Sequence, residues 1–223
     1  SHYVTGNDAL ISLAGPANKQ GRIIADNICG GDSRYLGSQG SSVIKVFDMT
    51  AATTGINETN AKKSGLEVDT VILSPMSHAG YYPGGKVMTM KVVFEKESYR
   101  LLGAQIIGYE GVDKRIDVLA TAIHAGLKAT QLKDLDLAYA PPYSSAKDPV
   151  NMAGFMIDNI AKGTLKQWHL EDMDKISKDK NVVLLDVRTV GEFNRGHMDG
   201  FKNIPVDELR ERINEIEKRK PVY

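Results

Sequence analysis

The sequence has little cysteine, few aromatic residues and no long apolar run. Its single cysteine, Cys29, cannot form a disulfide within the chain, and a reducing, cytoplasmic setting is the simplest interpretation. No apolar run approaches the roughly 20 residues that span a bilayer. The first residues do not join a basic stretch to an apolar segment, as a signal peptide would. We therefore expect no membrane partner.

An excess of either charge is also absent. The chain has 28 Lys plus Arg and 28 Asp plus Glu, so its formal net charge is zero. A balanced chain has no electrostatic reason to bind nucleic acid or an anionic membrane surface. Its 223 residues suffice for one large domain, or for one domain and part of another.

A Gly-Pro pair precedes the first expected element, a helix over residues 17–28. Pro16 suits a first helical position, because its missing N–H costs nothing there. Apolar side chains recur at helical spacing, and a Gly-Gly pair follows the helix, as is typical of a left-handed helix end. The apolar side chains are Ile23, Ile24 and Ile28.

Residues 41–162 predict an α+β domain with a mostly antiparallel sheet. Alternating apolar and polar residues indicate strands, and a turn at residues 95–98 indicates a hairpin between two of them. The sequence indicates two or three helices, the last with Asp148 as N-cap and Gly163 after its end. The expected strands cover residues 42–48, 68–73, 86–95 and 99–108, and the expected helices cover 57–64, 112–125 and 148–161.

The pattern changes after a linker at residues 163–169. Consecutive apolar residues at 182–185 are typical of a buried parallel strand, and residues 203–205 predict a second short strand. We expect one helical turn at 192–195 and a helix at 207–218. The side chains facing inward from that helix would be Leu209, Ile213 and Ile216. This alternation, with a further strand starting at 221, is typical of the opening of an α/β domain.

The start of the first helix could hold an anion. A helix N-terminus presents free N–H groups and a partial positive charge, and Lys19 and Arg22 stand nearby. The alternative is an ordinary helix start whose two cations are solvated. The residues taken alone favour the ordinary start.

Two loops carry tyrosines beside glycine and proline. One holds Tyr81 and Tyr82 between two strands, and the other holds Tyr139 and Tyr143 on either side of a Pro-Pro pair. A phenol can act as a general acid or can donate to a developing thiolate. The alternatives are a packing role for the first loop and a rigid connection for the second.

Other candidate groups favour structural roles. His78 has no second ligand at a suitable spacing, so no metal site is expected. Asp186 and Arg188 follow a buried strand, where an open α/β sheet places its ligand crevice, but a structural ion pair is the preferred interpretation. Cys29 ends a helix, and activated thiolates occur at helix starts or beside cations, so it is expected to be inert.

These motifs, in this order, resemble two known families. Residues 13–27, the Tyr81 loop and the segment 139–144 resemble the C-terminal third of the pyridine nucleotide-disulfide oxidoreductases, particularly the CoA-disulfide reductase and NADH oxidase branch. Residues 186–188, 192–193, 196–197 and 203–205 resemble the first half of a rhodanese domain, which some CoA-disulfide reductases carry at the C-terminus. The resemblance implies the end of an FAD-binding region at 1–40, a dimerisation domain at 41–162, and a truncated rhodanese-like α/β segment at 170–223.

The resemblance implies an FAD-dependent chemistry with coenzyme A as ligand. In this family, FAD takes hydride from NAD(P)H and passes electrons to a catalytic cysteine, which reduces a CoA disulfide, persulfide or polysulfide. The helix start would contact the flavin and stabilise the negative charge of its reduced form. The cofactor contacts implied are Ala14, Gly15, Pro16, Ala17 and Tyr139.

The resemblance also implies a homodimer with shared active sites. Tyr81 and Tyr139 would act in the partner subunit's site, where their hydroxyls donate to the leaving CoA thiolate. Tyr139 is assigned this role over Tyr143 because it precedes the Pro-Pro pair. The implied substrate contacts are Asn18, Lys19, Tyr81 and Lys147, with Lys19 meeting a CoA phosphate as a point charge.

Several parts of the family are not found in this sequence. They are the Gly-rich FAD segment, the NAD(P)H segment, the redox cysteine and the rhodanese persulfide cysteine. Because thiolate catalysis needs its thiol, we expect the chain to be part of a longer enzyme and inactive alone. Two alternatives are a non-enzymatic self-association module and a sulfurtransferase partner domain built on residues 170–223. The paired tyrosine loops favour the enzyme, because a dimerisation surface does not need them.

Overall fold

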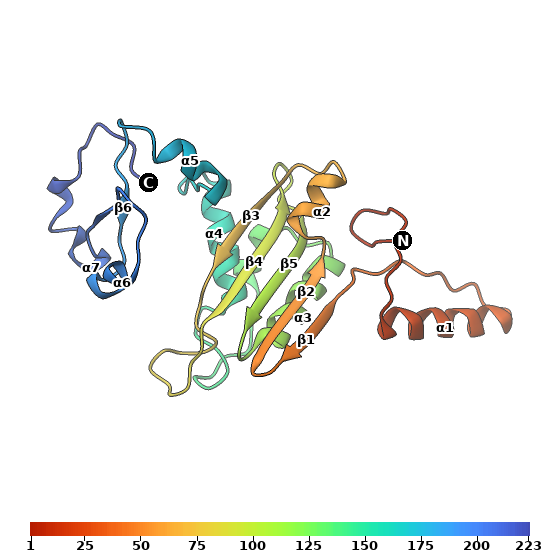
Figure 1. Ribbon diagram of the computed structural model, residues 1–223. Coiled ribbons are helices and arrows are strands. Elements are labelled where there is room, and N and C mark those ends of the chain that lie inside the picture. The colour runs from red at the N-terminus through yellow and green to blue at the C-terminus, as the bar shows by residue number, and fades with distance from the viewer. The chain divides into compact units, whose positions relative to one another are not determined.

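The computed structural model describes residues 1–223, and the chain divides into two compact units. Unit one comprises Ser1–Leu165 and unit two comprises Lys166–Tyr223. Figure 1 traces the chain from the N-terminal helix through a five-stranded sheet with helices to the short elements of unit two. None of the helices is long and apolar enough to cross a membrane.

Unit one is built on an antiparallel five-stranded sheet with the strand order β1-β2-β5-β4-β3. The central strand β5 pairs with β2 on one side and with β4 on the other. Ile106 of β5 lies opposite Ala52 of β2 and Met90 of β4, which sets the register of the whole sheet. The strands span Ser42–Val46 (β1), Met49–Gly55 (β2), Val68–Leu73 (β3), Met88–Glu95 (β4) and Leu101–Gly108 (β5).

Helices cover one face of this sheet and form the main core. Helix α3 packs on β2 and β5, and α4 packs on β3 and on the 3-10 helix η1 (Figure 1). Alternate residues of β4 point to this face because strand side chains alternate between faces: Met88, Met90, Val92 and Phe94 are all at most 1% exposed. The covering elements span Val112–His124 (α3), Ala129–Asp134 (η1) and Pro149–Ala161 (α4).

The opposite face of the sheet is covered only at one end. There α2, Glu58–Lys63, forms a smaller cluster with the sheet, made of Ile56, Ala61, Val68, Val93 and Leu102. The remainder of that face is open, and Ile44 of β1 is 61% exposed while Ile107 of β5 is 45% exposed. An antiparallel sheet tolerates one uncovered face, but this one carries large apolar side chains that a solvated face would not favour.

A carboxylate ties α2 to the open face. Glu58 bonds Lys62 within the helix at 2.5 Å and also pairs with Lys91 of β4. The hydrogen bond from Lys62, followed by that from Lys91, lowers the pKa of Glu58 to about 2. The charged form of Glu58 is therefore the form that the folded chain favours.

Helix α1, Ala14–Ile28, has no buried residue. It begins after Leu13, so the expectation that Pro16 opens the helix is wrong: Pro16 is its third residue. Proline is tolerated there because the first N–H groups of a helix have no intrahelical acceptor in any case. Gly30 ends the helix with a φ of +93°, which confirms the expected left-handed end.

Unit two contains a small parallel sheet with short helical turns. Strand β6 (Leu185–Asp186) pairs in parallel with β7 (Lys202–Asn203), and a parallel bridge joins Val183 to Val222. Its core is small, with Ile176, Ile204 and Pro205 as the buried residues. The other elements span Leu170–Asp172 (η2), Met173–Ile176 (α5), Val190–Arg195 (α6), Val206–Leu209 (α7) and Ile213–Glu215 (η3).

The structure confirms the α+β class and most of the expected elements, with further corrections. Of the strand expected at residues 182–185, only Leu185 lies in β6, which continues to Asp186. Strand β2 was not among the expected strands, because its Thr and Ala residues lack a strong apolar period. The single helix expected at 207–218 is wrong, since α7 and η3 are separate short turns there. Ile213, expected to face inward, is 48% exposed.

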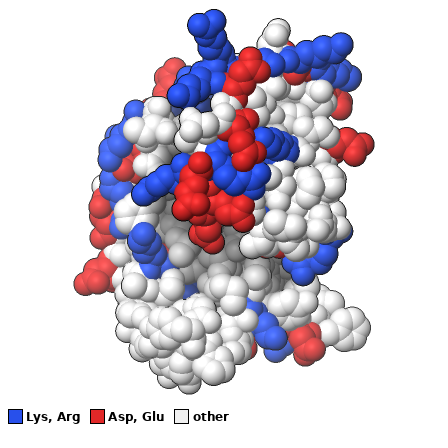
Figure 2. Space-filling view, turned by 90° about the vertical axis from the view of Figure 1, so that its left-hand side faces the viewer, with Lys and Arg blue, Asp and Glu red and all other residues white.

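Charges of both signs are interspersed on the face of the molecule in Figure 2. Acidic side chains lie beside lysines and arginines in this view. No extended single-sign field is visible there, in keeping with the zero net charge.

The close crossing of α4 and η1 can be tested at Gly154. A Cβ at this position would lie 2.2 Å from the Lys133 amide nitrogen and 2.7 Å from the Leu132 carbonyl carbon. We expect Gly154→Ala to lower the free energy of unfolding of the full chain by about 1–3 kcal/mol through overpacking. Gly21→Ala in α1, where nothing lies within 4 Å, should not lower it. Urea denaturation followed by circular dichroism measures the free energy of unfolding of both variants. Equal changes would contradict the close contact between α4 and η1.

The ion pairs of Glu58 predict a pH-dependent stability. The pKa of Glu58 is lowered from 4.5 to about 2. The contribution of Glu58 to the free energy of unfolding is therefore complete above pH 4.5 and is lost as the pH falls toward 2. Glu58→Gln should cost up to about 1 kcal/mol at pH 7, and the difference from the parent should shrink across that window. Glu67→Gln, at an exposed carboxylate directly before β3, is the control. A pH-independent difference in urea denaturation would refute the role of the charge.

Candidate active-site loops

Two tyrosines from distant parts of the sequence meet at the surface of unit one. Tyr81 lies in the loop between β3 and β4, and Tyr139 lies in the segment between η1 and α4. Their hydroxyl oxygens are 2.8 Å apart, although the residues are 58 positions apart in the sequence. The side chains remain accessible, with Tyr81 77% and Tyr139 46% exposed. The pair is therefore placed to meet a molecule from outside.

The contact changes the acidity of one phenol. The hydrogen bond with Tyr81, together with desolvation, raises the pKa of Tyr139 above its ordinary value. A phenol with a raised pKa stays protonated at neutral pH and remains a donor. One of the two hydroxyl protons is used in the contact between the phenols, so the pair can donate the other to an anion that docks against it.

The other tyrosines of these loops have different surroundings. Tyr143 is 70% exposed, and it is Tyr139, not Tyr143, whose hydroxyl bonds Tyr81. Tyr82 lies edge-on to the buried ring of His78, with ring centroids 5.6 Å apart. Tyr82 and His78 thus pack the root of the first loop.

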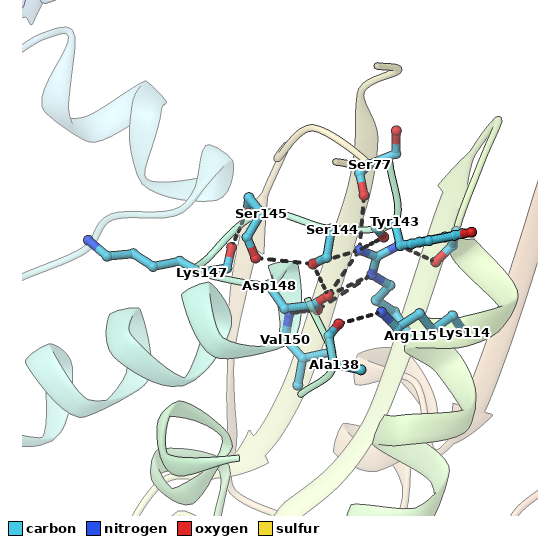
Figure 3. Close-up of polar contacts among 11 residues, drawn as sticks. Ser77, Lys114, Arg115, Ala138, Tyr143, Ser144, Ser145, Lys147, Asp148 and Val150 are labelled. Atoms are coloured by element: carbon cyan, nitrogen blue, oxygen red, sulfur yellow. Dashed lines mark hydrogen bonds and ion pairs between the residues drawn. The ribbon is translucent and has the colours of Figure 1, made fainter. Parts of the chain in front are cut away.

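A buried arginine holds both loops in place. Arg115 of α3 is 1% exposed and pairs with Asp148, the N-cap of α4, at 2.9 Å. The same Nη2 donates to the carbonyl oxygen of Ser77 at 2.9 Å, in the first loop. It also donates to the Tyr143 carbonyl and to Ser144 Oγ, each at 3.3 Å, in the second loop. Figure 3 shows these groups converging on the guanidinium.

Further hydrogen bonds join the two loops. The Ala79 amide donates to the Ser144 carbonyl at 2.9 Å, and Ser144 Oγ donates to Asp148 at 2.7 Å. Lys114, the neighbour of Arg115, donates to the Ala138 carbonyl at 3.3 Å, directly before Tyr139 (Figure 3). The first turns of α3 therefore tether the second loop at both ends.

The buried carboxylate of Asp148 is held in its charged form. Burial alone would raise its pKa, but hydrogen bonds from the Val150 amide, Ser144 and Arg115 outweigh burial and lower it. The charge is thus compensated on several sides, as a buried ion pair requires.

Sequence reasoning missed this cluster, although one signal was present. Arg115 stands on the inward face of α3 among Val112, Ile116 and Leu119, all of them buried. A charged residue at an apolar helical position is rarely buried unless it is paired. Asp148 was expected only as an N-cap, and the structure gives it both roles.

The predicted substrate and cofactor residues elsewhere are not joined to the tyrosine pair. Ala14, Gly15 and Ala17 lie in the first turn of α1 and are exposed. Asn18 donates its amide to the Ala14 carbonyl at 3.0 Å, while Lys19 lines a hollow with Gly15, Pro16, Tyr35 and His124. The exposed side chain of Lys147 extends away from the Arg115 cluster in Figure 3.

In unit two, Asp186 and Arg188 form a cross-link. Arg188 bonds both carboxylate oxygens of Asp186, with 2.6 Å between Nη2 and Oδ2, and donates to the Gly196 carbonyl at 3.0 Å. The Asn203 amide donates to the Asp186 and Arg188 carbonyls at 2.9 and 2.8 Å. This pattern fits the structural interpretation of the pair. No group of three or more His, Cys, Asp or Glu is placed to hold a metal ion.

Comparisons with known proteins give each unit a family. Residues 41–149 match the dimerisation domain of the pyridine nucleotide-disulphide oxidoreductases, and residues 169–223 match the rhodanese-like domain. A coenzyme A disulfide reductase from Staphylococcus epidermidis is 39% identical over 70% of this chain, which spans 35% of that relative.

Two solved structures match the whole chain, which spans 40% of each. The reduced CoADR-RHD of Bacillus anthracis is 47% identical with a TM-score of 0.94. An NAD-dependent persulfide reductase from A. fulgidus is 41% identical with a TM-score of 0.88. The chain therefore carries the dimerisation domain of the pyridine nucleotide-disulphide oxidoreductase family, followed by a rhodanese-like domain.

Proposed function

We propose that this chain serves in a homodimeric, FAD-dependent NAD(P)H oxidoreductase that reduces a CoA disulfide, a CoA persulfide or a polysulfide. The observation that carries the proposal is the 2.8 Å contact between the hydroxyls of Tyr81 and Tyr139. The names of the relatives, a coenzyme A disulfide reductase and a persulfide reductase, support the choice of substrate class. A pure self-association module would not need two exposed phenols held together.

In this proposal the two phenols assist the release of CoA. Reduction of a disulfide of CoA breaks an S–S bond and leaves a CoA thiolate, whose charge needs donors. A phenol is protonated at neutral pH, so the hydroxyl whose proton is not used in the contact between the two tyrosines can donate a hydrogen bond to that sulfur while the other hydroxyl supports it. Such donors are most effective where charge develops during the reaction. The site they complete belongs to the partner subunit.

The start of α1 fits an FAD-binding role. Its first turn contains no acidic residue and no side-chain cap. The free N–H groups of Ala14 and Gly15 are therefore available to an electron-rich edge of the flavin. Pro16 and Ala17 complete that turn, and Tyr139 is proposed as a further contact from the partner subunit. When bound, FAD supplies the transfer of electrons from NAD(P)H to a reactive cysteine of the full-length protein.

The CoA contacts are assigned to flexible polar side chains. Lys19 is exposed beside the α1 start, and its ammonium suits a CoA phosphate as a point charge. Asn18 and Lys147 are the further proposed contacts, with Asn18 able to release its bond to the Ala14 carbonyl.

The rhodanese-like domain favours a sulfur acceptor over oxygen. The single exposed cysteine, Cys29, favours a cytoplasmic location.

The role of the phenols can be tested by removing one hydroxyl at a time. In the full-length protein, Tyr81→Phe and Tyr139→Phe should each lower kcat for reduction of CoA disulfide by NAD(P)H about 100-fold, the usual cost of one preorganised donor. Tyr143→Phe removes a hydroxyl from the same loop, where it does not bond Tyr81, and should leave kcat unchanged. Steady-state rates with CoA disulfide, CoA persulfide and polysulfide would identify the acceptor. Unchanged kcat in both variants would end the proposal.

Self-association follows from the proposed sharing of the active site. We expect the full-length protein to sediment as a homodimer, because phenols and flavin must come from different subunits. Analytical ultracentrifugation over a range of concentrations measures the state. In a heterodimer of one Tyr139→Phe subunit and one subunit that lacks the reactive cysteine, one of the two shared sites has both groups intact. Mixing the two inactive variants should therefore restore activity. A monomer at high concentration would be incompatible with a shared site.

A further inference from the structure

The hydrogen bonds of Arg115 join segments that lie far apart in the sequence. Replacing a buried ion pair by apolar residues of similar volume is often neutral or stabilising, so such a pair is weak evidence for stability. Arg115 nevertheless directs its donors at three separate segments: the Ser77 carbonyl, the Tyr143–Ser144 turn and Asp148. The planar guanidinium fork fixes directions that a single ammonium cannot fix.

The tyrosine hydroxyls depend on these anchors because little else holds the side chains. Tyr81 is 77% exposed, and its hydroxyl bonds that of Tyr139. Each loop is internally bonded: the Ser77 amide donates to the Lys86 carbonyl at 2.7 Å, and the Tyr143 amide donates to the Ala140 carbonyl at 2.9 Å. A shift at Ser77 or Ser144 would therefore carry the corresponding phenol with it.

We propose that Arg115 is a positioning residue for the Tyr81–Tyr139 pair, and that it sets the separation of the two hydroxyls by holding the Ser77 carbonyl and the Tyr143–Ser144 turn on one guanidinium. This inference rests on the proposed function and extends it to a residue that touches neither CoA nor flavin. Lys114 supports the same arrangement through the Ala138 carbonyl.

The decisive variant is Arg115→Lys in the full-length protein, which keeps the charge opposite Asp148 but loses the fork. Tyrosine ¹³Cζ NMR, with the Tyr139 resonance assigned by Tyr139→Phe, reports the pKa of Tyr139 directly. Because the hydrogen bond with Tyr81 raises this pKa, Arg115→Lys should shift it down toward the ordinary value of about 10, as Tyr81→Phe should. The double variant should show no further shift, and kcat should fall by up to roughly 100-fold with KM nearly unchanged.

A stability control separates positioning from general damage. Val92→Ala, in the centre of β4, removes fully buried volume away from both loops. It should lower the melting temperature without moving the pKa of Tyr139. If Arg115→Lys does not fold, Ser144→Ala keeps the ion pair, removes one anchor and should shift that pKa in the same direction. An unchanged pKa in the folded variant overturns the inference.

The two proposals fail in different ways. If Tyr81→Phe and Tyr139→Phe leave kcat unchanged while Arg115→Lys still lowers the pKa of Tyr139, the positioning stands and the catalytic role is wrong. If the tyrosine variants lower kcat while Arg115→Lys changes neither kcat nor the pKa, the function stands and Arg115 has only a structural role.

Discussion

One buried guanidinium connects the helices of unit one to its candidate site. Arg115 leaves the first turns of α3, pairs with the N-cap of α4 and reaches the roots of both tyrosine loops. Helix packing and loop placement are thereby linked by one side chain. The cost of burying its charge is offset by Asp148 and by carbonyl oxygens that would otherwise lack donors. The α+β framework and the exposed phenols are thus parts of one hydrogen-bonded system.

The second unit uses the same device on a smaller scale. Arg188 bonds Asp186 and the Gly196 carbonyl, and Asn203 spans the two strand ends through main-chain oxygens. Here the charges are closer to solvent, so the hydrogen bonds matter more for geometry than for stability. With few buried apolar residues in this unit, such polar cross-links carry much of the local order.

Local sequence patterns predicted the strands and helices that are determined by neighbouring residues in the sequence. Alternation at residues 86–95 predicted β4, and Asp148 with Pro149 marked the start of α4. Strand β2 was missed because its Ala and Thr residues become a strand through pairing with neighbours on both sides. The break between α7 and η3 was missed because charged residues at helical spacing fit one continuous helix equally well.

The candidate site was predicted residue by residue but not as an assembly. The family resemblance identified Tyr81 and Tyr139, yet no pattern in the sequence indicates that their hydroxyls meet, since the contact depends on the tertiary placement of two loops. Arg115 was recognisable only as a misplaced charge on an apolar helix face. Its partners are mainly backbone carbonyls, which have no signature in the sequence.

Helix α1 has a consequence of its own. A helix of 15 residues without a buried side chain is held by its own backbone hydrogen bonds, and isolated helices of this length are marginal in water. Its amides should therefore open and close without involving the sheet. A surface that packs against the exposed Ile24 and Ile28 would stabilise the helix. The helicity of α1 would therefore report whether such a surface is bound.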